Sequence, residues 1–292
     1  MEQISVDLII WLQNTGGTFG EMFFNFISFL GEQYVYILVL AIVYWTYDKK
    51  FGEYLATTLG ISLSTNNFIK GVTELPRPYE TYSEIENLRP ETSYGSAFPS
   101  GHTQAFSSFL FAIAYKMRRY WWLIAIVLTL LMMMSRMYLG VHYLRDVLVG
   151  ASLGITIAIG HGYLFNRFYT DNEKLIQYYS IIALVLLPGL FFLESNSFFQ
   201  GYGIMTGLML ATSLEKKYVG FSVDKPLKTL VLRVLVGFAL LLATLMILKL
   251  VFGFIGTEEG SWAYNMLDFI RYFIVSLVGF LVYPALFKQL DY

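Results

Sequence analysis

The chain has 292 residues, of which 56% are hydrophobic and only 14% are charged, and its mean hydropathy is +0.56. Such values depart from those of water-soluble proteins and are typical of chains whose apolar segments are surrounded by lipid. The formal net charge of −1 leaves no concentrated basic surface, which argues against a nucleic acid partner. The absence of cysteine excludes disulfides, thiolate nucleophiles and cysteine-based metal sites.

Residues 5–30 are moderately apolar, but Gly16, Gly17 and Gly20 interrupt them. This pattern favours an interfacial or re-entrant helix over a full crossing. Further along, apolar runs are long enough to cross about 30 Å of hydrocarbon. They predict transmembrane helices at residues 33–47, 51–72, 101–117, 119–138, 143–165, 175–194, 197–214, 228–253 and 264–287. The predicted fold class is therefore all-α, a polytopic transmembrane helical bundle of about nine spans, with membrane lipids around it.

Lys and Arg recur in every second connection between these predicted spans, for example at Lys49, Lys50, Arg118 and Arg119. Short cytoplasmic loops are enriched in such residues, so we expect these connections to be cytoplasmic. The alternate connections, which include the acidic segment 73–100, are then extracytoplasmic.

Two pairs of glycines have a spacing that lets helices approach closely. They are Gly150 with Gly154 and Gly203 with Gly207. We expect both pairs to serve packing within the chain rather than a dimer face.

Three polar clusters lie at the predicted extracytoplasmic ends of apolar runs, where ionisable groups are costly and therefore indicate function. The first cluster contains Lys70 and Arg77. Pro76 and Pro78 disfavour a continuous helix at Arg77. Arg77 is therefore expected to reach in from a loop.

The second cluster comprises Ser100, Gly101 and His102, and it stands directly before an apolar run. This order predicts a helix N-terminus, which offers free backbone N–H groups and the positive end of the helix dipole. Ser100 and Gly101 can therefore bind a phosphate that His102 reaches as an acid or a base.

The third cluster contains Arg136, His142 and Asp146. The spacing of four between the last two residues places the carboxylate one helical turn from the imidazole. In that position the carboxylate can orient the ring and stabilise its cationic form.

Together the three clusters indicate phosphoryl transfer. Lys70, Arg77 and Arg136 would neutralise the phosphate oxygens, and His142 would attack phosphorus. His102 would protonate the leaving oxygen and later assist water, with a phosphohistidine as the intermediate. The three cations would take the place of the Mg²⁺ that many phosphoryl-transfer enzymes use. No cofactor and no metal are predicted.

Residues 70–78, 99–102 and 135–146 reproduce in order the tripartite signature K-x6-RP, PSGH and SR-x5-H-x3-D. Over roughly residues 20–165 the chain resembles the type 2 phosphatidic acid phosphatase superfamily. The resemblance implies a helical membrane fold, metal independence and the roles assigned above. It also implies lipid phosphates, prenyl diphosphates or sugar phosphates as substrates. The layout of the chain is similar to glucose-6-phosphatase and sphingosine-phosphate phosphatase.

We therefore predict a catalytic membrane core at residues 1–168 and additional transmembrane helices at residues 169–292. The second part departs from the minimal pattern of the superfamily, so the resemblance implies no role for it. It could shape a lipid entrance or a homo-oligomer.

Less specific interpretations exist for single residues. Lys70 or Arg77 alone could extend to lipid headgroups, and His161 is expected to serve interfacial packing. A zinc site built from His102, His142 and Asp146 is disfavoured, because three neighbouring cations would repel the ion. The acidic loop 80–91 is expected to be solvated, with headgroup contacts by Arg89 and Tyr94 as the alternative.

The predicted function is a membrane phosphatase that acts on a phosphorylated lipid at the extracytoplasmic face. The location would be the cell membrane, or the endoplasmic reticulum membrane if the source is eukaryotic. Two alternatives remain: a phosphotransferase that passes phosphate to a lipid or sugar alcohol, and a catalytically silent lipid transporter or scaffold.

Overall fold

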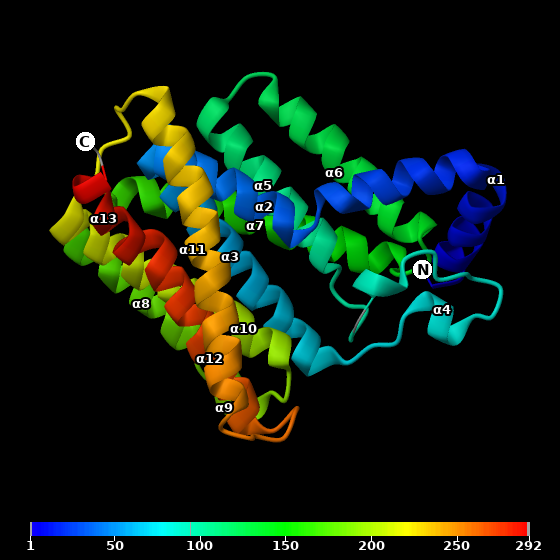
Figure 1. Ribbon diagram of the computed structural model, residues 1–292. Helices are drawn as coiled ribbons and strands as arrows, with labels where there is room; N and C mark the ends of the chain where they lie inside the picture. The colour runs from blue at the N-terminus through cyan, green and yellow to red at the C-terminus, as the bar shows by residue number, and fades with distance from the viewer. Residues whose placement is uncertain (1, 94, 291–292) are drawn as a thin grey trace. The chain divides into compact units, whose positions relative to one another are not determined.

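The computed structural model describes residues 2–93 and 95–290, and every regular element within them is helical (Figure 1). This confirms the all-α fold class. The elements in chain order are α1 (Glu2–Leu30), α2 (Gln33–Ile42), η1 (Val43–Tyr47), α3 (Lys49–Thr73), α4 (Pro78–Thr81), η2 (Pro90–Thr92), α5 (Gly101–Met117), α6 (Trp121–Tyr138), α7 (Leu144–Phe168), α8 (Asn172–Leu186), α9 (Gly189–Phe192), α10 (Asn196–Leu214), η3 (Glu215–Val219), α11 (Leu227–Gly253), α12 (Trp262–Leu277), η4 (Val278–Val282) and α13 (Tyr283–Leu290).

Five stretches among the described residues are long and apolar enough to cross a membrane. They are Trp121–Tyr138, Leu144–Phe168, Asn172–Phe192, Leu227–Gly253 and Trp262–Phe287. A sixth results if α1 and α2–η1, which are bent by 46° at their junction, count as one broken span. The expected count of about nine spans is therefore not confirmed. Two of the helices outside this set, α3 and α5, carry many polar side chains, and α5 has only 17 residues.

The start of the chain is interrupted, as its glycines predict. Gly17 has φ 53° and ψ −162°, values that break the helical course of α1. Glycine adopts such a conformation without steric cost. The bend between α1 and α2 is compatible with a broken span or a re-entrant segment.

The chain divides into two compact units. Unit 1 comprises residues 1–36 and 65–162, and unit 2 comprises residues 37–64 and 163–292. Both α3 and α7 therefore contribute residues to each unit. The division of roles at residue 168 remains a prediction.

In unit 1, α7 approaches α5 closely through its glycines. A Cβ atom at Gly154 would lie 2.1 Å from Ser107 Oγ and 2.4 Å from the Gln104 carbonyl oxygen. A Cβ atom at Gly150 would lie 2.7 Å from the Ser100 carbonyl oxygen. The prediction of packing within the chain is confirmed for this pair, and the close approach brings the first turns of both helices together.

In unit 2, the second glycine pair seats α10 against α12. Cβ atoms at Gly203 and Gly207 would lie 2.4 and 2.7 Å from the carbonyl oxygens of Phe269 and Phe273. These two helices lie side by side in Figure 1. The expected packing within the chain is thus confirmed here as well.

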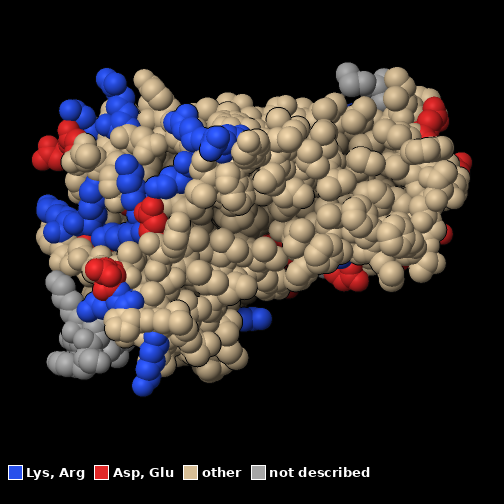
Figure 2. All heavy atoms as spheres, turned by 90° about the horizontal axis from the view of Figure 1, so that it is seen from above, with Lys and Arg blue, Asp and Glu red and all other residues tan. Residues whose placement is uncertain are grey.

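Figure 2 shows Lys and Arg side chains gathered at one end of the face in view. In unit 2, several basic side chains contact acidic or aromatic groups. Lys49 pairs with the buried Glu215. The ammonium groups of Lys50 and Lys216 lie 4.5 and 3.8 Å from the centre of the Tyr169 ring. Aromatic rings combined with basic side chains are typical of membrane interfaces.

Candidate active site

Lys70 lies in the last turns of α3, and its ammonium group donates to the Ser96 carbonyl oxygen. The segment after α3 returns to this position because the Ala97 N–H donates to the Leu75 carbonyl oxygen at 2.8 Å. A Cβ atom at Gly101 would lie 3.9 Å from Lys70 Cε. Lys70 therefore lies against the N-terminus of α5, as the first two clusters predict.

Arg77 precedes α4 and is 2% exposed. Its Nη1 donates to the Val141 carbonyl oxygen at 3.0 Å, and its Nε donates to the Gly95 carbonyl oxygen at 3.1 Å. The first contact fixes the guanidinium beside the backbone that carries His142. Arg77 lies in the non-helical connection between α3 and α4, and its reach from this loop into a phosphate site stays a prediction.

The N-terminus of α5 stands where the sequence predicts it. Ser100 caps the helix, because its hydroxyl oxygen accepts from the Thr103 hydroxyl at 3.0 Å and from the Thr103 N–H at 3.5 Å. The Ser100 N–H donates to the Asp146 carbonyl oxygen at 3.0 Å. Donors for a phosphate at this helix end would therefore be the Ser100 hydroxyl hydrogen and the N–H groups of Gly101 and His102.

Asp146 is fully buried in the first turn of α7. Its Oδ2 accepts from the Tyr143 N–H at 2.8 Å and lies 3.7 Å from His142 Nδ1. The contact with Tyr143 satisfies a free donor at the start of the helix, so the carboxylate has a structural role in addition to its position beside the imidazole. Nδ1 of His142 therefore faces Asp146, and Nε2 is the ring nitrogen on the side away from the carboxylate.

Arg136 lies in the last turn of α6 and is fully buried. Its Nη1 donates to the hydroxyl oxygen of Ser28 in α1. Its carbonyl oxygen accepts from the Val141 N–H at 3.3 Å, which closes the turn before His142. Arg136 is thereby held on the same short segment as the proposed nucleophile.

Unit 1 contains all of the predicted site residues, and the cations among them act electrostatically on His142. Burial lowers the pKa of His142 well below its usual value, and the positive charges of Arg77, Lys70 and Arg136 lower it further. The imidazole is therefore neutral at neutral pH, which is the form that can attack phosphorus. Four buried polar atoms of the candidate site have no hydrogen-bond partner in the part of the chain that the structure describes: His102 Nε2, His142 Nδ1, Arg136 Nε and Arg136 Nη2.

The sequence motifs missed several residues that shape the site. Asn66 Nδ2 donates to Gln104 Oε1 at 2.8 Å, and this joins α3 to α5 within unit 1. A Cβ atom at Gly31 would lie 3.2 Å from His102 Cδ2, which places the end of α1 against the imidazole. The position of Asn66 four residues before Lys70 was a signal for a shared helix face. Nothing in the sequence indicates that Ser28 and Gly31 belong to the site.

Other candidates lie apart from this cluster. His161 is buried in α7, as expected for a packing residue. Tyr94 lies outside the described residues. Within residues 2–93 and 95–290, no three His, Asp or Glu side chains are arranged to hold a metal ion.

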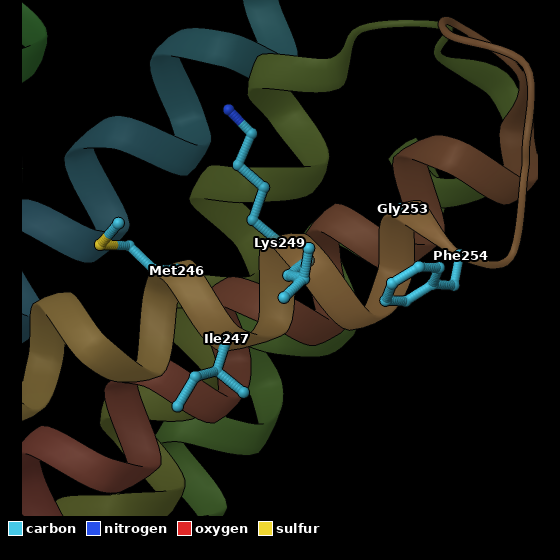
Figure 3. A pocket seen from close by; sticks show the side chains of 6 residues that line it. Met246, Ile247, Lys249, Gly253 and Phe254 are labelled. Atoms are coloured by element: carbon cyan, nitrogen blue, oxygen red, sulfur yellow. The ribbon is translucent and has the colours of Figure 1, made fainter.

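A hollow of about 600 Å³ lies elsewhere, on the surface of α11 (Figure 3). Figure 3 shows Met246, Ile247, Lys249 and Phe254 around it. Its lining is apolar except for one ammonium group and includes no nucleophile and no acid. We therefore do not regard it as a reaction site.

The fold is that of a helical membrane protein in which three cations and His102 act electrostatically on the buried His142. Comparison with known families agrees. The chain matches the PAP2 superfamily over residues 52–171 and the transmembrane extension of PAP2 superfamily phosphatases over residues 199–292. Together the two matches span most of the sequence, and the chain belongs to the PAP2 superfamily.

Relatives with curated names differ in their substrates. The chain is 30% identical to an undecaprenyl-diphosphatase of Sulfolobus acidocaldarius, over 46% of this chain and 65% of that protein. It is 27% identical to a probable sphingosine-1-phosphate phosphatase of Dictyostelium discoideum, over 56% of this chain and 43% of that protein. The chain thus spans less than two thirds of either relative. The crystal structure of Aquifex aeolicus LpxE, 27% identical, covers 54% of this chain and 94% of its own, with a TM-score of 0.45.

Proposed function

We propose that this chain is an integral membrane phosphatase that hydrolyses a lipid phosphate or prenyl diphosphate through a phosphohistidine. The observation that carries the proposal is the convergence of Arg77, Arg136 and Asp146 on His142 within one compact unit. A neutral imidazole among fixed cations is suited to attack a phosphate whose charge those cations neutralise. Family membership and the names of the relatives support the same reaction.

The proposed reaction has two steps. The Nε2 lone pair of His142 attacks phosphorus, the bond from phosphorus to the leaving oxygen breaks, and His102 gives its proton to that oxygen. His102 then takes a proton from water, whose oxygen attacks the phosphohistidine. The bond from phosphorus to nitrogen breaks, and inorganic phosphate leaves. Asp146 keeps the ring oriented in both steps.

The extracytoplasmic position of the site rests on unit 1. Arg118 and Arg119 follow α5 directly, whereas His102 stands at its other end, and Arg136 stands at the far end of α6. A helix of this length separates its ends by about 25 Å. With basic connections on the cytoplasmic side, we propose that the pocket opens outward. Localisation to the cell membrane, or to the endoplasmic reticulum of a eukaryote, follows from the same orientation.

The experiment is phosphate release by purified protein in detergent, without an added acceptor, across a panel of phosphorylated substrates. The panel contains a prenyl diphosphate, a phosphatidate, a sphingoid phosphate and a soluble sugar phosphate. We expect repeated turnover with at least one lipid and no loss of rate in excess EDTA, because fixed cations supply the charge. Release of one equivalent only would indicate an obligatory transferase, no release would favour the transporter or scaffold, and EDTA inhibition reversed by a divalent ion would refute the metal-free mechanism.

The pH dependence should reflect the environment of His142. Attack requires the neutral ring, and a pKa held below the usual value of about 6.5 keeps the ring neutral at lower pH. We therefore expect the acid limb of kcat/KM, which reports the free enzyme, to have its midpoint below about 6.5. A second substrate with a different phosphate pKa separates this limb from titration of the substrate. A midpoint above the usual histidine value would contradict the assignment.

A further inference from the structure

A fourth cation lies beside the site, outside all three motifs. Arg89 directly precedes η2, and its Nη1 donates to Asn25 Oδ1 at 2.8 Å and to the Asn25 carbonyl oxygen at 3.3 Å. Its Nη2 pairs with the carboxylate of Glu32. All three residues belong to unit 1. Arg89 thereby ties the acidic loop to the end of α1.

The same end of α1 touches the site. Gly31, the neighbour of Glu32, packs against His102, and Ser28 accepts from Arg136. The charge of Arg89 acts on both His102 and Arg136. The cations that act on His142, in contrast, are Arg77, Lys70 and Arg136. Arg89 therefore belongs to the side of the pocket that holds His102.

That side is where the leaving group departs. In phosphoryl transfer the attacking and leaving atoms lie roughly in line with phosphorus. With His142 as nucleophile and His102 as acid, whatever is attached to the leaving oxygen extends beyond His102 toward Arg89. A monoester leaves as a neutral alcohol, which gains nothing from a guanidinium, whereas a diphosphate leaves as a phosphate that carries negative charge.

The Arg89 guanidinium can bind such an anion. Its Nε is buried and has no hydrogen-bond partner among residues 2–93 and 95–290. Nε and Nη2 together present the edge of the guanidinium that pairs with two oxygens of one anion. Glu32 occupies Nη2 and acts as the counter-ion of the guanidinium. A phosphate, with more charge and more acceptor oxygens than one carboxylate, can compete for this edge.

We propose that Arg89 forms a second anion subsite, which binds the departing phosphate and favours diphosphates over monoesters. The inference rests on the proposed function. His142 attacks the terminal phosphorus, the bond from that phosphorus to the bridging oxygen breaks, and His102 protonates the bridging oxygen. The departing monophosphate ester is held by Arg89, while Glu32 limits the affinity of Arg89 for anions.

The test compares Arg89→Gln and Glu32→Gln, which break the same ion pair. For each variant, kcat/KM is measured with farnesyl diphosphate and with farnesyl monophosphate on the same preparation. The ratio of the two values is the selectivity, and it does not depend on the fraction of folded protein. We expect Arg89→Gln to lower the selectivity about 10- to 100-fold. Glu32→Gln should raise it or leave it unchanged, and Arg89→Lys, which keeps the charge, should lie between Arg89→Gln and wild type.

A purely structural ion pair predicts a different result. If Arg89 only held α1 in place, both glutamine variants would lower kcat/KM for the two substrates in parallel, and the selectivity would stay constant. A constant selectivity in Arg89→Gln would therefore overturn the proposal. Failure of the proposed function is separate, because wild type would then release no phosphate from either substrate.

Discussion

We expect His142→Ala to lower the rate of phosphate release by at least about 10⁴-fold while the protein remains folded. The imidazole lies 3.7 Å from the Asp146 carboxylate. It follows Val141, whose carbonyl oxygen accepts from Arg77 and whose N–H donates to the Arg136 carbonyl oxygen. A methyl group cannot accept a phosphoryl group, so the covalent step is lost. The remaining cations would still bind phosphate. Steady-state phosphate release measures the loss, and acid-labile label from a ³²P substrate in wild type detects the intermediate.

His161→Ala is the matched control for this variant. It removes the same side chain from the same helix-rich unit, but it lies about four turns beyond Asp146. We expect it to retain activity. The monodispersity of the two variants in detergent is compared in parallel. Equal losses in both variants would show that the effect is general destabilisation, and His142 would then no longer stand as the nucleophile.

The helical elements were predictable because their signals are local. The predicted span 228–253 coincides closely with α11, and the start of α5 at Gly101 follows from its Ser100 cap. The number of crossings was less predictable. Polar residues such as Glu53 in α3 face the protein interior, so hydropathy alone does not separate a polar span from a helix that does not cross.

The reacting groups of the site were predictable for another reason. His142 and Asp146 are one helical turn apart, so the spacing alone predicts their contact. The cationic side chains and the helix N-terminus indicate anion binding from the sequence alone. Arg89 and Glu32 were not predictable as a pair, because 57 residues separate them. In the sequence, Arg89 stands in an acidic loop whose composition indicates only solvation. The fold brings it to the end of α1.

Arg136→Ala is expected to lower phosphate release by about 10³-fold or more, because this guanidinium can stabilise charge that develops on the phosphate oxygens. The free energy of unfolding of Arg136→Ala should rise or change little relative to wild type. Arg136 is fully buried near Arg77, and two of its nitrogens have no hydrogen-bond partner among the described residues. Removing one of several like charges relieves repulsion, which offsets the lost contact with Ser28.

Inorganic phosphate separates these two effects. In wild type, phosphate bound between the cations should raise the thermal unfolding temperature, since a ligand that binds only the folded state stabilises it. Arg136→Ala should lose most of that increase, whereas Arg167→Ala, at an exposed position at the end of α7, should keep it. Arg136→Lys keeps the positive charge but lacks the planar guanidinium that can pair with two phosphate oxygens. We expect it to recover more of the phosphate-induced rise in unfolding temperature than of the catalytic rate. If Arg136→Ala bound phosphate as wild type does, Arg136 would not belong to the anion pocket.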